Sequence, residues 1–408
     1  MLPADHESDD GLCAVSARGV RVQYADGSER LCGTSGLWNC NLGYGNEAVV
    51  RAASEALSDA SYLSVWGYEN SYAREAAECL VNLAGPEWFT RVLFSTSGGS
   101  ANDLVMKIAR HYYAIRGDEE RKGIVGLEGG YHGLTFGAFA LTSSSLGQGM
   151  YGVDRRMVAH VPPNDSDALE KLLLKNPGRV AAVVVEPVIG TAAVPLTSDY
   201  VDALLDMRER YDFLLVADEV STGFCRIGPM FASHEWPSPP DILISAKGLT
   251  NGTAAASAVI VSGKVSDTFA DAGAVLSHAE TQAGTPVVTA SILAVASEME
   301  RLDAASLSRA VSVGLDAHLD ELQAREVMVS ASTGRGCLRA VHLQDSNGES
   351  LGRAEIGDVV ASIRRAGAVV HPGPGCVQLL PALVYGNEDL SELMDRVAFG
   401  LAAYREES

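Results

Sequence analysis

A carboxylate and an amine each follow an apolar segment of strand length in the middle of the chain. Asp218 comes directly after Phe213-Leu-Leu-Val-Ala217, and Lys247 follows Asp241-Ile-Leu-Ile-Ser245, 29 residues after Asp218. In open α/β sheets, ligands bind at the carboxyl ends of the strands, so we expect both groups in one crevice. One such residue alone is most often an ordinary surface charge, but the two together are far more specific.

The chemistry that this pair allows is narrow. A lysine in a crevice can form a Schiff base with a carbonyl when its neighbours lower its pKa. A buried aspartate can pair with a pyridinium nitrogen and keep the ring electron-withdrawing. These are the two protein groups that pyridoxal phosphate requires. Lys247 and Asp218 therefore predict a site for that cofactor.

Two glycine-containing turns strengthen this hypothesis. The segment Phe94-Ser-Thr-Ser-Gly-Gly-Ser-Ala-Asn102 runs from a strand end to a helix start, where free N–H groups bind phosphate. Alone, it is explained more simply by a glycine-rich turn with a serine cap. The segment Gly129-Gly-Tyr-His-Gly133 places an aromatic ring after another short strand, where it could stack on a cofactor or be an ordinary buried tyrosine.

The elements around these residues alternate between strands and helices. Short apolar runs predict strands at residues 91–95, 124–127, 180–185, 213–217, 241–245 and 258–262, and helical periodicity predicts helices at 100–113 and from about 286 to 324. Strands that are apolar on both faces indicate a mostly parallel sheet covered by helices. The fold class is therefore α/β, with a mostly parallel central sheet flanked by helices.

Composition excludes several other classes of function. The chain has 408 residues, with 31 Lys and Arg against 52 Asp and Glu, a net charge of −21. This acidity argues against partners that are nucleic acids or anionic membranes. The acidic start MLPADHESDD lacks a signal-peptide pattern, and seven cysteines without a CxxC pair argue against disulfides and a metal site. We therefore expect a cytoplasmic protein without a metal.

The quoted segments, taken together, resemble the class III aminotransferases, which are fold-type I pyridoxal-phosphate enzymes. The matching segments occur in family order and cover most of the chain; they are Gly36–Gly45, Ser97–Asn102, Tyr131–Gly133, Val185–Val188, Ala217–Gly228, Ser245–Gly248 and His278–Pro286. The resemblance implies a large cofactor domain at residues 46–324. A small α/β lobe would combine an N-terminal segment, 1–45, with a C-terminal domain, 325–408.

The resemblance also implies a role for each matching residue. Lys247 would hold the cofactor as an aldimine and shuttle the proton, and Asp218 would pair with the pyridine nitrogen. The remaining cofactor contacts would come from Gly98, Gly99 and Ser100 at the phosphate, Val220 and Tyr131 on the ring faces, and His132 and Glu186 nearby. Thr281 would reach the phosphate of the neighbouring subunit's cofactor, which implies a homodimer with shared active sites.

Departures from the family pattern bear on the substrate. Gly99 and Ser100 stand where the family usually has a hydroxyl residue followed by glutamate, so Ser100 is the candidate for the missing hydroxyl contact. Gln378 stands where many ornithine- and aminobutyrate-type members have an arginine, which disfavours recognition of a dicarboxylate. Trp38 resembles the pocket tryptophan of the ω-amine:pyruvate branch. Trp66 and Arg226 are further candidates for the substrate pocket, and Arg226 could instead serve the dimer.

Three functions remain open at this point. The first is transamination from an amine or amino-acid donor to a ketone or aldehyde. The acceptor could be a peptide ketone, since the chain also resembles the aminotransferases of daptide-type peptide pathways, which aminate a ketone at a peptide C-terminus. The second is an aminomutase or racemase of the same fold, in which Lys247 and Asp218 serve equally well. The third, a cofactor-binding regulator, would need a DNA-binding module, and the chain has neither the extra length nor the basic patch.

Overall fold

The computed structural model describes residues 9–407, so most of the acidic N-terminal start lies outside the described residues. The chain forms two compact units. Unit 2 comprises Ala48–Phe224 and Pro229–Glu298. Unit 1 comprises the chain up to Glu47, the short segment Cys225–Gly228, and the chain from Met299 onward. No helix within residues 9–407 combines the length and apolar composition that crossing a bilayer requires.

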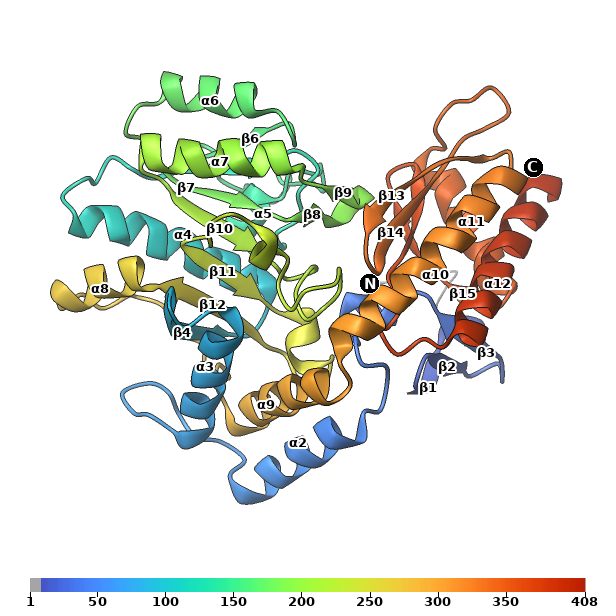
Figure 1. Ribbon diagram of the computed structural model, residues 1–408, viewed down its shortest axis with the longest axis horizontal. Helices are drawn as coiled ribbons and strands as arrows, with labels where there is room; N and C mark the ends of the chain where they lie inside the picture. Colours follow the sequence, from blue (N-terminus) through green and yellow to red (C-terminus); the bar gives the residue numbers. More distant parts are fainter. Residues whose placement is uncertain (1–8, 408) are drawn as a thin grey trace. The chain divides into compact units, whose positions relative to one another are not determined.

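A seven-stranded sheet forms the centre of unit 2 (Figure 1). Its order is β4-β12-β11-β10-β7-β5-β6, and only β12 runs antiparallel to its neighbours. The strands are β4 (Phe89–Ser95), β5 (Gly123–Leu127), β6 (Val158–Val161), β7 (Val180–Val185), β10 (Leu214–Asp218), β11 (Ile242–Ser245) and β12 (Ser257–Ser262). The expected mostly parallel sheet is confirmed, and β6 is a strand that the sequence analysis missed.

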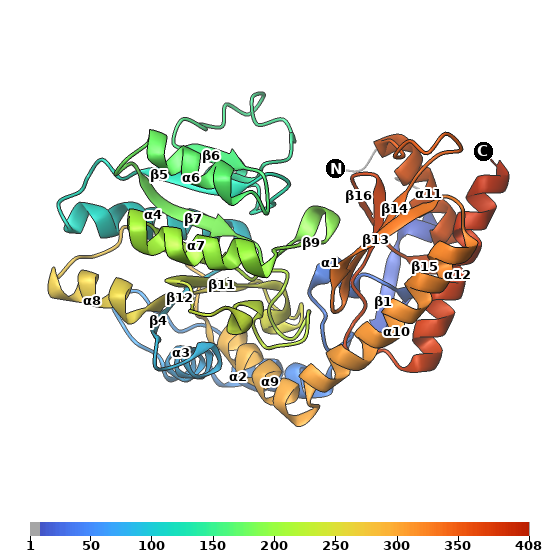
Figure 2. The ribbon, with the colours of Figure 1, turned by 45° about the horizontal axis from the view of Figure 1, so that its top comes forward.

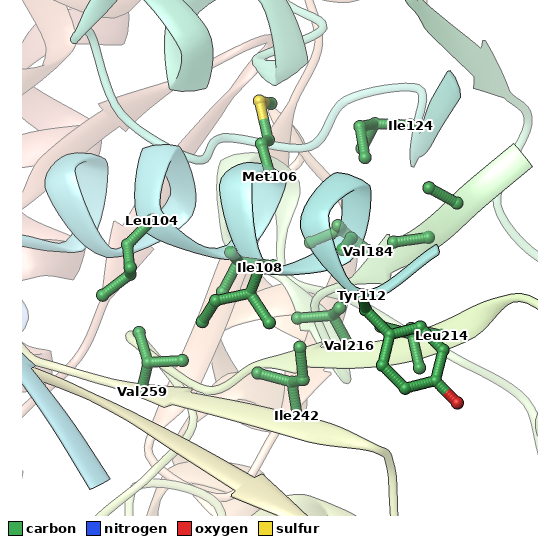
Figure 3. Packing of buried hydrophobic residues seen from close by; sticks show 14 of the residues in the cluster. Leu104, Met106, Ile108, Tyr112, Ile124, Val184, Leu214, Val216, Ile242 and Val259 are labelled. Carbon is green, nitrogen blue, oxygen red and sulfur yellow. The ribbon is translucent and has the colours of Figure 1, made fainter. Parts of the chain in front are cut away.

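Alternate side chains of this sheet pack into two separate cores. Val184 of β7 and Ile242 of β11 pack against side chains of the helix α4 (Gly98–Ile115), as Figure 3 shows, and Ala182 belongs to the same core. Val183 and Val185 of β7 face the helices α6 (Ser166–Lys175) and α7 (Ser198–Tyr211) on the opposite side. Both faces are therefore buried, which explains why these strands are apolar throughout instead of alternating.

The helices of unit 2 cover the sheet, with α4 and α7 on opposite faces (Figures 1 and 2). Several begin at a side-chain cap: Ser97 caps α4 and Thr197 caps α7 by accepting from a backbone amide three residues on. The bounds are α2 (Glu47–Asp59), α3 (Ser71–Ala84), α4 (Gly98–Ile115), α5 (Phe136–Leu141), α6 (Ser166–Lys175), α7 (Ser198–Tyr211), α8 (Gly263–Asp271) and α9 (Pro286–Arg301). The hairpin of β8 (Val188–Ile189) and β9 (Val194–Pro195) completes the unit.

Within residues 9–407, unit 1 contains two four-stranded sheets with three helices of more than ten residues. One sheet has the order β1-β2-β3-β15 and the other β13-β14-β17-β16. The strands are β1 (Ala14–Arg18), β2 (Arg21–Tyr24), β3 (Glu29–Cys32), β13 (Val329–Arg335), β14 (Leu338–Leu343), β15 (Ala368–Val369), β16 (His371–Gly373) and β17 (Cys376–Leu379). The helices are α10 (Ala304–Arg325), α11 (Arg353–Arg365) and α12 (Asn387–Glu407), and a short turn, α1 (Ser35–Trp38), precedes α2.

The units differ from the sequence-based domain boundaries at three places, the smallest of which is a shift of the first boundary from residue 45 to Glu47. Residues 299–324 belong to unit 1, whereas the sequence analysis assigned them to the large domain. The reason is the apolar side of α10, where Val311, Leu315 and Leu319 are buried and the helix packs on β13 and α12. Cys225–Gly228 also belongs to unit 1, because the Arg226 carbonyl accepts from the amide of Cys337.

Candidate active site

Six strands of the unit 2 sheet run in the same direction and end at the same edge, and residues of the sequence-predicted site lie at or just after the ends of five of them. β11, β10, β7, β5 and β6 are parallel, and β4 has the same direction because β12 between β4 and β11 is antiparallel to both. The site residues are Gly98 after β4, Tyr131 after β5, Glu186 after β7, Asp218 in β10 and Lys247 after β11. The topology therefore gathers at one edge residues that are far apart in the sequence.

Lys247 is held in an uncommon backbone conformation. It begins a short 3-10 turn (Lys247–Thr250) with a φ of 43°, in the left-handed region. Such a conformation costs a non-glycine residue on the order of 1–3 kcal/mol and is concentrated at functional sites. Its Nζ donates to Oγ of the buried Ser221 at 2.7 Å. The sequence analysis missed Ser221, whose position three residues after Asp218 is its only signal.

Asp218 is buried and accepts three hydrogen bonds. Its Oδ2 lies 2.7 Å from Nδ1 of His132 and 2.9 Å from Nδ2 of Asn102, and its Oδ1 accepts from the amide of Val220 at 3.1 Å. Burial works to lower the pKa of His132, but the hydrogen bond and charge of Asp218, with the charge of Glu186, hold it above its ordinary value. His132 thus directs a ring nitrogen at the carboxylate.

Asn102 connects this carboxylate to the glycine turn. Its Nδ2 lies 2.9 Å from Asp218, 3.1 Å from the carbonyl of Gly98 and 3.2 Å from the carbonyl of His132. The side chain is buried, on the second turn of α4. The sequence analysis quoted Asn102 only as part of a motif. Its spacing of four residues from Gly98, on the inner side of a helix, is the signal that could have identified it.

Glu186 orients the loop that carries the aromatic residue. It is buried, and its two oxygens accept from the amide of Tyr131 at 2.9 Å and the amide of Gly190 at 3.0 Å. Burial raises the pKa of Glu186 above its ordinary value, and the charge of Asp218 adds to this rise, against the opposing effect of His132. Tyr131 itself remains 44% exposed, so its ring is available at the sheet edge.

α4 begins with Gly98 and Gly99, which have no side chains to cover the first backbone amides of the helix. A Cβ on Gly98 would lie 3.2 Å from the methyl groups of Val220, and one on Gly99 would lie 3.3 Å from Oγ1 of Thr135. Ser97 caps the helix by accepting from the amide of Ser100 at 3.1 Å, and it also donates to the Ser100 hydroxyl at 3.2 Å. Helix geometry leaves the first amides without intrahelical partners, which favours an anion here.

Glu219 beside Asp218 has a structural position. It is fully buried, and its carboxylate accepts from the Thr222 hydroxyl, the Ala232 amide, and the amide and hydroxyl of Ser233, all within 2.8 Å. Burial raises the pKa of Glu219, against the effect of these hydrogen bonds. The side chain therefore closes the loop that follows β10 and faces away from the edge residues.

Arg226, a candidate for the substrate pocket, lies buried within unit 1. It is 0% exposed. Its guanidinium donates to the carbonyls of Leu380 and Pro381 at 3.3 and 2.6 Å, to Oγ of Ser35 at 2.8 Å, and to Oδ1 of Asn41. Burial lowers the pKa of Arg226 to about 10. Arg226 therefore links segments within unit 1, and most of its N–H donors are not available to a substrate carboxylate.

The other candidates for the substrate pocket have different surroundings. In unit 1, Trp38 is half-buried with its ring against His371, 5.3 Å between centroids, and Gln378 is 1% exposed on β17. In unit 2, Trp66 is 66% exposed on the loop between α2 and α3, and Thr281 is exposed on the segment before α9. Trp66 and Thr281 lie outside the hydrogen-bonded group around Asp218.

Comparison with known proteins shows the family to which the chain belongs. The family described as aminotransferase class-III matches residues 4–399. The chain is 32% identical to an omega-aminotransferase of Caulobacter vibrioides, over 68% of this chain and 69% of that protein. It is 30% identical to a putrescine–pyruvate aminotransferase of Pseudomonas aeruginosa, over 68% of this chain and 64% of that protein.

A solved structure with the same fold is an amine transaminase from an uncultivated Pseudomonas species, in its pyridoxal-phosphate-bound, internal-aldimine form. It superposes with a TM-score of 0.93 at 27% identity, covering 99% of this chain and 97% of the other. This likeness confirms the expected fold-type I architecture, and the family indicates pyridoxal 5'-phosphate as the cofactor. The chain therefore belongs to the class III aminotransferases, the pyridoxal-phosphate-dependent enzymes that transfer amino groups.

Proposed function

We propose that transamination takes place at the carboxyl edge of the unit 2 sheet, with Lys247 and Asp218 as the catalytic residues. The observation that carries this proposal is the arrangement at one edge of the Lys247 amine, the carboxylate of Asp218 with its two side-chain partners, and the open helix start at Gly98. When bound, pyridoxal phosphate supplies an electron-withdrawing ring that takes up negative charge from the substrate carbon.

The environment of Asp218 fits the ring nitrogen of this cofactor. An ionised carboxylate offers about four acceptor positions, and the amide of Val220, Asn102 and His132 take up three of them. Capacity for one further donor remains, which suits a single pyridinium N–H. Asn102 and His132 also fix the carboxylate plane, so that this capacity has a defined direction. We assign Asn102 and His132 as positioning residues for Asp218.

The helix start before α4 suits the cofactor phosphate. Gly98 and Gly99 present backbone amides without side chains in front of them, and the helix dipole favours an anion there. The Ser100 hydroxyl already accepts from Ser97, so it can still donate its own hydrogen to a phosphate oxygen. We therefore retain Ser100 as the hydroxyl contact. Val220 and Tyr131 are assigned to the two ring faces.

Lys247 has the task of moving a proton. Its free amine would accept the proton that leaves the substrate carbon and would later donate it again within the site. Its left-handed backbone and its hydrogen bond to Ser221 restrict where Nζ can lie. A proton donor that is already confined loses less conformational entropy when the transition state forms, and this favours catalysis.

The proposed substrates are an amine or amino-acid donor and a ketone or aldehyde acceptor, including a peptide with a C-terminal ketone. Two features favour substrates without a second carboxylate. Gln378 stands in place of an arginine, and the guanidinium of Arg226 is already hydrogen-bonded within unit 1. A panel of ¹⁵N-labelled donors with pyruvate, an aldehyde and a peptidyl ketone tests this. We expect the label in the aminated acceptor. A product that retains its own amino group without a keto co-substrate would identify an aminomutase or racemase and contradict the proposal.

Thr281 is proposed to contact the phosphate of the partner's cofactor in a homodimer. Its exposure on the segment before α9 supports this assignment. We expect Thr281→Ala to weaken cofactor binding about tenfold, the loss of one hydrogen bond to a charged group. Hybrid dimers of Lys247→Ala and Thr281→Ala chains provide the decisive measurement. If Thr281 acts on the partner's site, the one lysine-bearing site of the hybrid is intact and should bind the cofactor with wild-type affinity; binding there as weak as in the Thr281→Ala homodimer would contradict the assignment.

Ser221 is predicted to assist Lys247. Ser221→Ala removes the acceptor that lies 2.7 Å from Nζ, and we expect kcat to fall about two- to tenfold, the usual effect of one such hydrogen bond. Ser221→Thr keeps the hydroxyl and should retain most of the rate. The measurement is a stopped-flow comparison of protiated and α-deuterated donor. An unchanged isotope-sensitive rate in Ser221→Ala would show that the contact does not assist proton transfer.

A further inference from the structure

A second carboxylate touches the start of the glycine turn from outside the Asp218 group. Glu280, on the segment before α9, accepts hydrogen bonds from the hydroxyls of Ser95 and Thr96 and from the Thr96 amide at 3.1 Å. Ser95 is the last residue of β4, and Thr96 precedes the cap of α4. Three hydrogen bonds from two consecutive residues fix both the backbone and the side chains at this point.

The same segment is fastened to α4 itself. Lys107 of α4 lies with its Nζ 3.3 Å from Nδ1 of His278 and 3.2 Å from the carbonyl of Ser277. Because the lysine can only donate, Nδ1 of His278 accepts, and Nε2 then donates to Glu280 at 3.2 Å. A continuous chain of polar contacts thus runs from α4 through His278 and Glu280 to the residues that enter α4.

The charge of Glu280 needs an explanation, because its carboxylate contacts Ser95 and Thr96, which come just before the proposed phosphate site at the start of α4. Burial alone would raise the pKa of Glu280, but hydrogen bonds from Ser95, Thr96 and His278 hold it below its usual value. The carboxylate is therefore ionised at neutral pH. A negative charge beside a phosphate site weakens phosphate binding by repulsion. Glu280 can favour phosphate binding only if the site geometry that its hydrogen bonds hold contributes more to the binding free energy than this repulsion costs.

We propose that Glu280 is a positioning residue for the cofactor phosphate: by holding Ser95 and Thr96, it sets the direction of the backbone amides at Gly98 and Gly99. The proposal rests on the assignment of the α4 start as the phosphate site. Ser97 is held from the other side, where the Ser257 hydroxyl donates to its carbonyl at 2.8 Å. The turn is thus fixed between β12 and the Glu280 segment.

The experiment compares pyridoxal phosphate with pyridoxal, which lacks the phosphate, in equilibrium titrations of the cofactor-free full chain. In Glu280→Ala we expect the dissociation constant of pyridoxal phosphate to rise about tenfold and that of pyridoxal to change less than about twofold. Thr96→Val should produce the same phosphate-specific loss, and the double variant should lose less than the product of the two. Glu119→Ala, which removes an exposed carboxylate elsewhere in unit 2, is the matched control.

The outcomes separate this proposal from the proposed function. If wild type does not prefer pyridoxal phosphate over pyridoxal, the phosphate site and the role of Glu280 both fail. If wild type shows the preference and Glu280→Ala keeps it, only the role of Glu280 is overturned. Equal losses for both ligands would also overturn it, because they indicate a general structural role. If Glu280→Ala does not fold, the same comparison is made with Glu280→Gln, which keeps the side-chain size and one acceptor oxygen.

Discussion

Replacing Lys247 by alanine is expected to abolish amino transfer, with a fall in kcat of about 10⁴-fold or more. The variant loses both the amine that holds the cofactor and the base that moves the proton, and general acid–base catalysis alone contributes about 10²–10⁴-fold. Cofactor would still bind through the helix start and Asp218. The visible absorbance of the lysine-bound cofactor should therefore disappear while a weaker, non-covalent complex remains.

Two control experiments test whether this effect is specific to Lys247. Lys122→Ala removes an exposed lysine next to β5, at the opposite end of the parallel strands, and should leave turnover unchanged. Adding a small primary amine to Lys247→Ala should restore part of the rate, because a free amine can replace the missing base. Wild-type turnover in Lys247→Ala would overturn the assignment of this lysine. Loss of turnover in Lys122→Ala as well would point to a general effect of removing a lysine.

The proposed catalytic pair could be identified from the sequence because each residue follows an unbroken apolar run. Leu214–Ala217 and Ile242–Ile244 are buried on both faces of the sheet, so their hydrophobic pattern marks the strand ends before any contact is known. Strand direction then places Asp218 and Lys247 at one edge. The fold could be predicted to the same extent, since its central strands are encoded locally.

The roles of Asn102, Ser221 and Glu280 depend on contacts with distant parts of the chain, and the spacings that could have marked Asn102 and Ser221 are weak signals. Asn102 meets Asp218 across the sheet edge, and Glu280 meets Thr96 across 184 residues. Polar residues of these types are common on turns and helices, and only the rotamer and the partner distinguish a positioning residue from a solvated one. No local sequence pattern indicates the rotamer or the partner.

Arg226 illustrates the opposite difficulty. A charged residue next to a recognised motif is expected at a surface or in a substrate pocket, since an arginine is almost never fully buried unless it is paired. Here its acceptors include the backbone carbonyls of Leu380 and Pro381, which any amino acid could supply. The sequence therefore contains no sign of this burial. α10 is a related case, because its apolar side could equally well pack on either unit.

Asp218→Asn is predicted to have the second large effect, a fall in kcat of about 10²–10³-fold with cofactor still bound. The amide cannot supply the negative charge that stabilises a protonated ring nitrogen, and removal of one preorganised electrostatic group typically costs about this much. Its amide group also has only one oxygen. Either Val220 on one side or Asn102 and His132 on the other must then face an N–H donor. We expect a loss of stability of about 1–3 kcal/mol from this mismatch.

The effect on His132 adds a pH dependence with a definite sign. In wild type the folded-state pKa of His132 is raised by Asp218, so its protonation stabilises the fold below the unfolded value of about 6.5 and this contribution is lost as pH rises through the folded pKa. In Asp218→Asn only the charge of Glu186 still opposes burial, so the pKa of His132 falls relative to wild type. The difference in free energy of unfolding between the two proteins should therefore narrow from pH ~6 to pH ~9. Denaturant titrations at both pH values measure it, and a difference that stays constant or widens would mean that His132 is not charged beside Asp218.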